Sequence, residues 1–142
     1  MSPVNTRRRI PADAHPIIVV AAVIERDGHF LVTRRLKGTH LADYWEFPGA
    51  KCEPNETHPA CLARELAEEL NVTAEIGAEL LQTEHAYPDR TVRLHFLICR
   101  LLTDPRPMLG QEMRWVPRAE LRRLPFPEAD RDLIDVLTGA PT

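Results

Sequence analysis

Apolar and polar residues follow two different periods along this chain. A continuous apolar run at Ile17–Glu25 predicts a buried strand. The Asp27-Gly28 pair predicts a tight turn and His29–Thr33 a second strand, so we expect a hairpin. Trp45–Phe47 is a short extended segment that stops at Pro48-Gly49. The first fifty residues therefore predict sheet.

From Thr57 the period changes to that of a helix. Leu62, Leu66 and Leu70 recur every four residues and share one helical face. Thr57 is suited to cap the N-terminus of this helix. Asn71 follows the last apolar residue and is able to take the left-handed conformation that ends a helix. The pattern predicts one strong central helix.

The remaining residues predict more sheet and a smaller helical region. Apolar residues alternate with polar ones after a turn at 87–90, and two prolines make 104–110 a loop. The expected elements are strands at 72–85, 92–98 and 113–116, a helical turn at 117–124, and a closing helix at 128–137 that Gly139 ends. Together they predict an α/β fold with a mixed sheet.

Composition and charge limit the class of protein. The chain has 142 residues, of which 44% are hydrophobic and 27% charged, so we expect one globular domain at 16–142 behind a flexible tail at 1–15. Its longest apolar run is far shorter than the roughly 20 residues of a membrane span. The net charge of −3 argues against a duplex nucleic-acid partner. It leaves a nucleotide substrate open, because a metal ion can supply positive charge.

The cysteines give a further expectation. Cys52, Cys61 and Cys99 are odd in number, and no pair has the short spacing of a zinc site. The start of the chain lacks the apolar stretch of a signal peptide. We therefore expect three free thiols in a reducing compartment and a cytoplasmic protein.

Three glutamates on the central helix carry the candidate chemistry. Glu65, Glu68 and Glu69 are spaced i, i+3 and i+4, so their carboxylates leave one face and repel one another. They also lie in the C-terminal half of the helix, where the helix dipole disfavours acids. Either this is an acidic surface face, or it is a site for a hard cation such as Mg²⁺, which takes oxygen ligands.

The segment from Gly49 to Val72 resembles the signature box of the Nudix hydrolases. That box has a glycine, five residues, a glutamate, seven residues and then Arg-Glu-aliphatic-x-Glu-Glu-x-Gly-aliphatic. All five charged positions match, at Glu56, Arg64, Glu65, Glu68 and Glu69. Ala50 and Asn71 replace two glycines. Neither change removes a metal ligand, so we expect an active enzyme, although Ala50 would be strained at a positive φ.

The resemblance narrows to the MutT-like nucleoside triphosphate pyrophosphohydrolases and implies an α/β/α sandwich with a mixed central β-sheet. By resemblance, Arg35 and His40 contact the nucleotide, and Glu46, Phe47 and Pro48 line its site. The carbonyl of Gly49 and the carboxylates of Glu65, Glu68 and Glu69 would bind the metal, with Glu56 as an additional or supporting group. Without the resemblance, Arg35 would be interpreted as a surface charge and His40 as a loop histidine.

Two departures from the MutT pattern bear on the metal and the base. Leu109 stands where MutT has a metal-binding loop glutamate, and Glu112 is the candidate substitute. Asp130 stands where MutT reads the base with an asparagine. An ionised Asp130 accepts hydrogen bonds from the N1–H and amine of guanine or from the amine of cytosine. Alternatively, Asp130 is an acid favoured by the N-terminus of its helix.

The implied reaction is hydrolysis of a nucleoside triphosphate to the monophosphate and pyrophosphate, with Mg²⁺ as the cofactor and Mn²⁺ also accepted. Glu65 or Glu68 would be the general base, and Arg64 would orient the glutamates. The expected substrate is 8-oxo-dGTP, with CTP or 5-methyl-dCTP as the alternative. An ADP-ribose-type hydrolase and a non-catalytic nucleotide sensor are further alternatives. No duplex nucleic acid and no membrane is expected as a partner, and the chain would be a monomer or weak homodimer.

Overall fold

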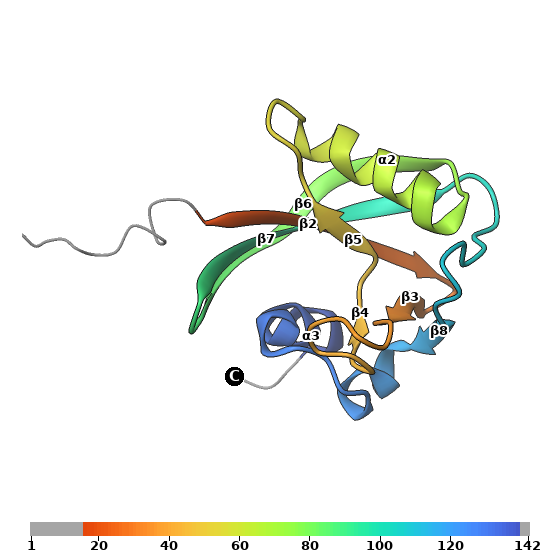
Figure 1. Ribbon diagram of the computed structural model, residues 1–142. Helices are drawn as coiled ribbons and strands as arrows, with labels where there is room; N and C mark the ends of the chain where they lie inside the picture. The colour runs from red at the N-terminus through yellow and green to blue at the C-terminus, as the bar shows by residue number, and fades with distance from the viewer. Residues whose placement is uncertain (1–15, 140–142) are drawn as a thin grey trace, which may run out of the picture.

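The computed structural model describes residues 16–139, and the tail expected at 1–15 lies outside them. Figure 1 shows one sheet system with helix α2 above it and helix α3 below it. The elements are β2 (Ile17–Arg26), β3 (His29–Arg34), β4 (Trp45–Glu46), β5 (Gly49–Lys51), α2 (His58–Leu70), β6 (Ala74–Tyr87), β7 (Arg90–Leu101), β8 (Met113–Pro117), the 3₁₀ helices η1 (Arg118–Arg123) and η2 (Glu128–Asp130), and α3 (Arg131–Thr138).

Strand β2 is the centre of the sheet. It pairs in parallel with β7 along its length and antiparallel with both β3 and β5. The order β4-β3-β2-β7-β6 is completed by β5 on β2 and β8 on β3. Because one pair is parallel and the others are antiparallel, the sheet is mixed, as predicted.

Two apolar cores lie on opposite faces of the sheet. One packs Leu62, Leu66 and Leu70 of α2 against residues of β2 and β7. The other joins Leu133, Leu137 and their neighbours in α3 to β3, β7 and β8. Successive side chains of a strand point to opposite faces of the sheet, so the same strands contribute apolar residues to both cores. This arrangement confirms the α/β/α sandwich with a mixed central β-sheet.

Helix α2 has the ends that the sequence predicts. The Thr57 side chain accepts a hydrogen bond from the Ala60 N–H at 3.2 Å. Asn71 takes the left-handed conformation with φ 52°, and its N–H donates to the Ala67 carbonyl. Ala50 is not among the described residues with positive φ, so its replacement of glycine introduces no strain. No helix in residues 16–139 is long and apolar enough to cross a membrane.

Gly49 begins strand β5, which the sequence pattern does not predict. The segment was expected to stop at Pro48-Gly49, but β5 continues there and pairs with β2 through Val19, Val20 and Ala21. A Cβ on Gly49 would lie 2.7 Å from the Ala21 Cα and would also overlap the Val20 carbonyl oxygen. The two strands therefore cross so closely that a side chain at position 49 has no room.

The expectation of three free thiols is wrong, because Cys52 and Cys61 form a disulfide. Cys52 follows β5 and Cys61 lies in the first turn of α2, with their Cα atoms 5.6 Å apart. The turn into α2 brings the two residues together, which their spacing alone did not reveal. Cys99 stays a buried thiol. The closing helix also differs from expectation, since η2 precedes α3 over the predicted range.

Candidate active site

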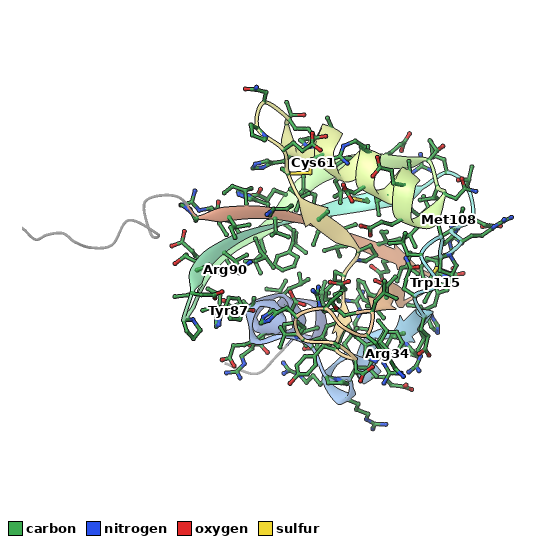
Figure 2. The ribbon with its side chains drawn as sticks, in the orientation of Figure 1. Arg34, Cys61, Tyr87, Arg90, Met108 and Trp115 are labelled. Carbon is green, nitrogen blue, oxygen red and sulfur yellow. A yellow bond between two sulfur atoms is a disulfide. The ribbon has the colours of Figure 1, made fainter. Side chains whose placement is uncertain are left out.

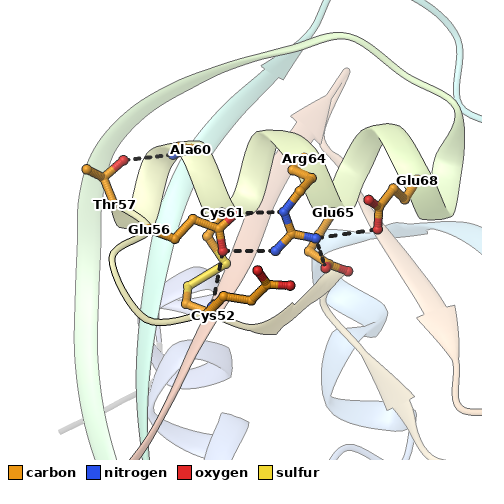
Figure 3. A network of polar contacts seen from close by, with 9 residues as sticks. Cys52, Glu56, Thr57, Ala60, Cys61, Arg64, Glu65 and Glu68 are labelled. Carbon is orange, nitrogen blue, oxygen red and sulfur yellow. Dashed lines mark hydrogen bonds and ion pairs between the residues drawn. A yellow bond between two sulfur atoms is a disulfide. The ribbon is translucent and has the colours of Figure 1, made fainter.

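Arg64 organises the acidic side chains on α2 (Figure 3). Its guanidinium donates to both carboxylate oxygens of Glu56, from Nε at 2.6 Å and from Nη2 at 2.9 Å. Nη1 donates to Glu65 at 2.5 Å and to Glu68 at 3.4 Å. The bonds from Arg64 to Glu56, together with one from the Glu53 N–H, lower the pKa of Glu56 to about 2. Glu56 is therefore fully ionised and committed to Arg64.

Glu69 has the opposite electrostatic environment. Burial is the main reason why its pKa rises to about 8. A hydrogen bond with Glu65 and the charges of Glu65, Glu46 and Glu68 raise it further. A carboxyl group crowded by three others is poorly stabilised as an anion unless a cation joins it. The donor set consists of carboxylate oxygens, which suits a hard divalent cation.

A pocket of about 360 Å³ is lined by Arg35, Glu46 and Gly49. These three residues also line a smaller pocket of about 200 Å³, which Glu69 of the carboxylate cluster borders. The Arg35 side chain crosses the wall of the larger pocket, donating from Nη1 to Glu46 at 2.7 Å and from Nε to the His40 carbonyl at 2.6 Å. Aromatic and acidic groups complete the wall. The side chains that a bound nucleotide would meet there are Arg35, His40, Glu46, Phe47, Tyr87 and Asp130. Figure 2 places Tyr87 near α3, at the end where β6 turns into β7.

Asp130 is the buried acid of this pocket, with only 6% of its surface exposed. Burial is the main cause that raises its pKa to about 7, and the nearby Glu46 adds to the shift while Arg35 opposes it. Burial likewise raises the pKa of Glu46, against the effect of Arg35. At neutral pH, Asp130 therefore exists in both its protonated and its ionised form.

Two predicted site residues lie elsewhere. Pro48 is buried and its carbonyl accepts a hydrogen bond from the Ala22 N–H at 2.7 Å, so it joins β2 rather than lining the pocket. Glu112 pairs with Arg34 at 3.1 Å and with Arg114 at 3.3 Å. Both of its oxygens contact arginines, and Glu112 does not line the pocket that Glu69 borders.

Gln111 borders the same pocket as Glu69 and was not among the predicted site residues. It is buried, and its side-chain amide donates to the Glu69 carbonyl at 3.3 Å and accepts from the Leu109 N–H at 2.8 Å. The Met108 N–H donates to the same Glu69 carbonyl at 2.9 Å. The loop before β8 is thus fastened to the end of α2 that carries the acids. The available signal was the Gly110-Gln111 pair in a loop otherwise rich in proline.

A second group of side chains near α2 has donor atoms close enough together to share a metal ion. Donor atoms of Cys52, Glu56 and Cys61 lie within 4.8 Å of one another. The two sulfurs are joined in a disulfide, and Glu56 is engaged by Arg64. Since the thiolate is the form that binds metals, this group does not fit an ion while the disulfide is present.

Comparison with known proteins agrees with this geometry. A family model described as the NUDIX domain matches residues 19–136. The chain is 38% identical over 122 residues to an 8-oxo-dGTP diphosphatase of Haemophilus influenzae, covering 83% of this chain and 89% of that protein. It is 42% identical over 79 residues to a CTP pyrophosphohydrolase of Escherichia coli, covering 56% of this chain and 58% of that protein. Among solved structures, the Escherichia coli ORF135 protein superimposes with a TM-score of 0.79 at 31% identity, covering 91% of this chain and 94% of that one.

Proposed function

Because the chain belongs to the Nudix hydrolase family, we propose that it hydrolyses a nucleoside triphosphate to the monophosphate and pyrophosphate. One observation carries this proposal. Glu46 lines one pocket with Asp130 and another with Glu69 of the α2 cluster. Its charge raises the pKa of both of these carboxyl groups. The acidic cluster suited to phosphate chemistry is therefore adjacent to a pocket with a buried group for reading a base. A triphosphate bound across Glu46 would span both.

The cofactor proposed for the α2 cluster is Mg²⁺, with Mn²⁺ as an alternative. Glu65, Glu68 and Glu69 would hold it together with the Gly49 carbonyl, while Glu56 supports them through Arg64. The raised pKa of Glu69 supports this assignment, since it marks carboxylates that lack a compensating charge. When bound, the ion supplies positive charge for the phosphates and makes water a stronger acid.

The side chains of the chain itself divide the remaining work. Arg64 fixes the positions of Glu56 and Glu65 by short ionic hydrogen bonds. Glu65 and Glu68 are the candidates to take a proton from the attacking water, and the side chain of Glu68 is 60% exposed and thus free to turn toward it. Arg35 is placed to contact the nucleotide at the pocket wall. The products leave as a monophosphate and a pyrophosphate.

The proposed base is 8-oxoguanine, and cytosine is the second candidate. The relative from Haemophilus influenzae supports the first and the Escherichia coli CTP pyrophosphohydrolase supports the second. Asp130 favours neither on its own. Its ionised form accepts from two guanine donors, whereas its protonated form donates to cytosine N3 while accepting from the cytosine amine. The biological role would be removal of oxidised nucleotides or turnover of cytosine nucleotides in the cytoplasm.

The decisive experiment measures kcat/KM with Mg²⁺ for dGTP, 8-oxo-dGTP, CTP, 5-methyl-dCTP and ADP-ribose, quantifying pyrophosphate and phosphate. We expect pyrophosphate release with 8-oxo-dGTP preferred, and activity lost in Glu69→Gln. A preference for cytosine nucleotides would select the second candidate, and a preference for ADP-ribose a diphosphate hydrolase. Tight nucleotide binding without turnover would instead indicate a sensor. Wild-type turnover in Glu69→Gln would exclude the proposed metal ligands.

A further inference from the structure

Two histidines and a glutamate meet at the N-terminal end of α2, away from the acidic cluster. His58, Glu79 and His95 each offer one ligand atom, and these atoms lie within 4.8 Å of one another. The His95 Nδ1 is 2.7 Å from a Glu79 carboxylate oxygen. The rings of His58 and His95 have their centroids 4.3 Å apart. The three consecutive elements α2, β6 and β7 therefore direct imidazole and carboxylate groups to one point.

The fold explains why these side chains converge. Glu79 lies opposite Leu97 on β7, at an irregularity in β6 where the register shifts on both sides. A bulge of this kind redirects a side chain. Leu97 and His95 are two residues apart and so share the face of β7 that α2 covers. His58 is the first residue of α2 and stands above that face.

Burial differs among the three groups in a way that suits a bound ion. His95 is 8% exposed, which fixes its ring within the protein. The Glu79 side chain is 40% exposed and His58 is partly buried, so these two form the outer edge. A tetrahedral zinc ion holds its ligand atoms roughly 3.4 Å apart, since zinc–nitrogen bonds are about 2.0–2.1 Å long. The ligand atoms here range from the 2.7 Å of the His95–Glu79 pair to at most 4.8 Å, and this spacing falls inside that range.

We propose that His58, Glu79 and His95 bind a divalent transition-metal ion, most suitably Zn²⁺, at a site separate from the acidic cluster. Imidazole nitrogens suit Zn²⁺, whereas Mg²⁺ prefers oxygen ligands throughout. Three protein ligands leave one position of a tetrahedral ion for water. The site lies roughly 16 Å along the helix axis from Glu69, at 1.5 Å per residue.

The bound ion joins the start of α2 to β6 and β7. Within the described residues, α2 already contacts β6, β5 and β2, and the Cys52–Cys61 disulfide joins its first turn to the end of β5. The metal adds a further attachment, on the side of β6 and β7. Its expected effect is on the stability of the helix that carries the box glutamates, and it takes no part in phosphate chemistry.

Zinc binding by the full chain tests this site directly. The protein is kept oxidised, so that Cys52 and Cys61 stay paired, and excess Mg²⁺ occupies the acidic cluster. Competition with a chromophoric chelator then gives zinc stoichiometry and affinity. We expect one zinc ion per chain, and an affinity that falls by about tenfold or more in His58→Gln and in Glu79→Gln. His29→Gln, at the distant β2–β3 turn, is the matched control and retains wild-type affinity.

A spectroscopic measurement keeps the test independent of folding defects in variants of the buried His95. Co²⁺ in place of Zn²⁺ gives visible absorption bands whose intensity reports tetrahedral coordination, and we expect these in wild type and in Glu69→Gln. The bands should be lost in His58→Gln, whose substitution lies at the outer edge. Zinc affinity unchanged in both His58→Gln and Glu79→Gln, or lost in Glu69→Gln, would overturn the proposal.

Discussion

Arg64 binds the Glu56 carboxylate, eight residues earlier in the chain, through two parallel hydrogen bonds. Two guanidinium nitrogens donate to the two carboxylate oxygens at 2.6 and 2.9 Å. Glu56 lies before α2 and Arg64 lies within it. The pair therefore fixes the loop after β5 against the helix. The remaining nitrogen of Arg64 is left to contact Glu65 and Glu68.

Replacing Arg64 by lysine should keep the charge and lose the paired geometry. A lysine ammonium is a point charge that cannot bond both oxygens of Glu56 while also holding Glu65. Loss of such a supporting contact typically costs about 10- to 100-fold in metal affinity or activity. Steady-state kinetics at several Mg²⁺ concentrations should show this loss, largest at low Mg²⁺. Arg100→Lys, an exposed arginine paired with Glu75, is the matched control, and an equal loss there would contradict the assignment.

The metal-free protein should lose stability as pH rises from about 4.5 to 8. The folded-state pKa of Glu69 is raised to about 8, so folding favours its protonated form, and ionisation at higher pH destabilises the fold. One such group contributes up to about 1.4 kcal/mol per pH unit. Glu56 has a lowered pKa and does not contribute in this range.

Urea denaturation in the presence of a chelator measures this effect. Glu69→Gln should show a shallower decline in the free energy of unfolding between pH 5 and pH 8, because Gln does not titrate. Asp130 titrates in the same direction and remains in both proteins, so the difference between them isolates Glu69. Superimposable pH profiles would contradict the proposed environment. Added Mg²⁺ should reduce the wild-type decline.

Base preference should depend on pH through Asp130, whose pKa is raised to about 7. The ratio of kcat/KM for 8-oxo-dGTP to that for CTP should rise by about tenfold from pH 6 to pH 8.5, since one hydrogen bond to a charged group is worth about 1.5–3 kcal/mol. In Asp130→Asn the ratio should not vary with pH. A ratio that varies equally in the variant would assign the effect to another group.

Reduction of the Cys52–Cys61 disulfide should lower the free energy of unfolding by about 2–3 kcal/mol, because the bond closes a short loop in the unfolded chain. Chemical denaturation with and without a thiol reductant measures the difference. Cys52→Ser should be insensitive to the reductant. Cys99→Ser should keep the response, since Cys99 is a separate buried thiol. A wild-type protein unaffected by reductant would show that the two thiols are not paired in solution.

Local signals predicted the helix and the box correctly. The cap at Thr57, the leucine repeat and the end at Asn71 depend on residues within one segment, and the structure follows all three. The spacing of the glutamates likewise follows from helical geometry. These features were predictable because they depend on residues that are close together in the sequence.

Features that depend on distant partners were missed. Strand β5 has only three residues, Gly49, Ala50 and Lys51, and is a strand because β2 lies beside it. The contacts of Gln111 and Glu112 depend on distant partners in the same way. The Arg34 N–H donates to the Glu112 carbonyl at 2.9 Å, which joins this part of the loop to the end of β3. Gln111 turns inward to the end of α2, and Glu112 turns outward to two arginines.

The crossing of β5 over β2 also has a genetic consequence. Because a side chain at position 49 would overlap the backbone of β2, only glycine permits both strands to form. A library randomised at codon 49 and selected for folded protein should retain only the four glycine codons, which share their first two bases and differ in the third. The next codon, for Ala50, should accept a wider set, since that residue is partly exposed and has ordinary extended backbone.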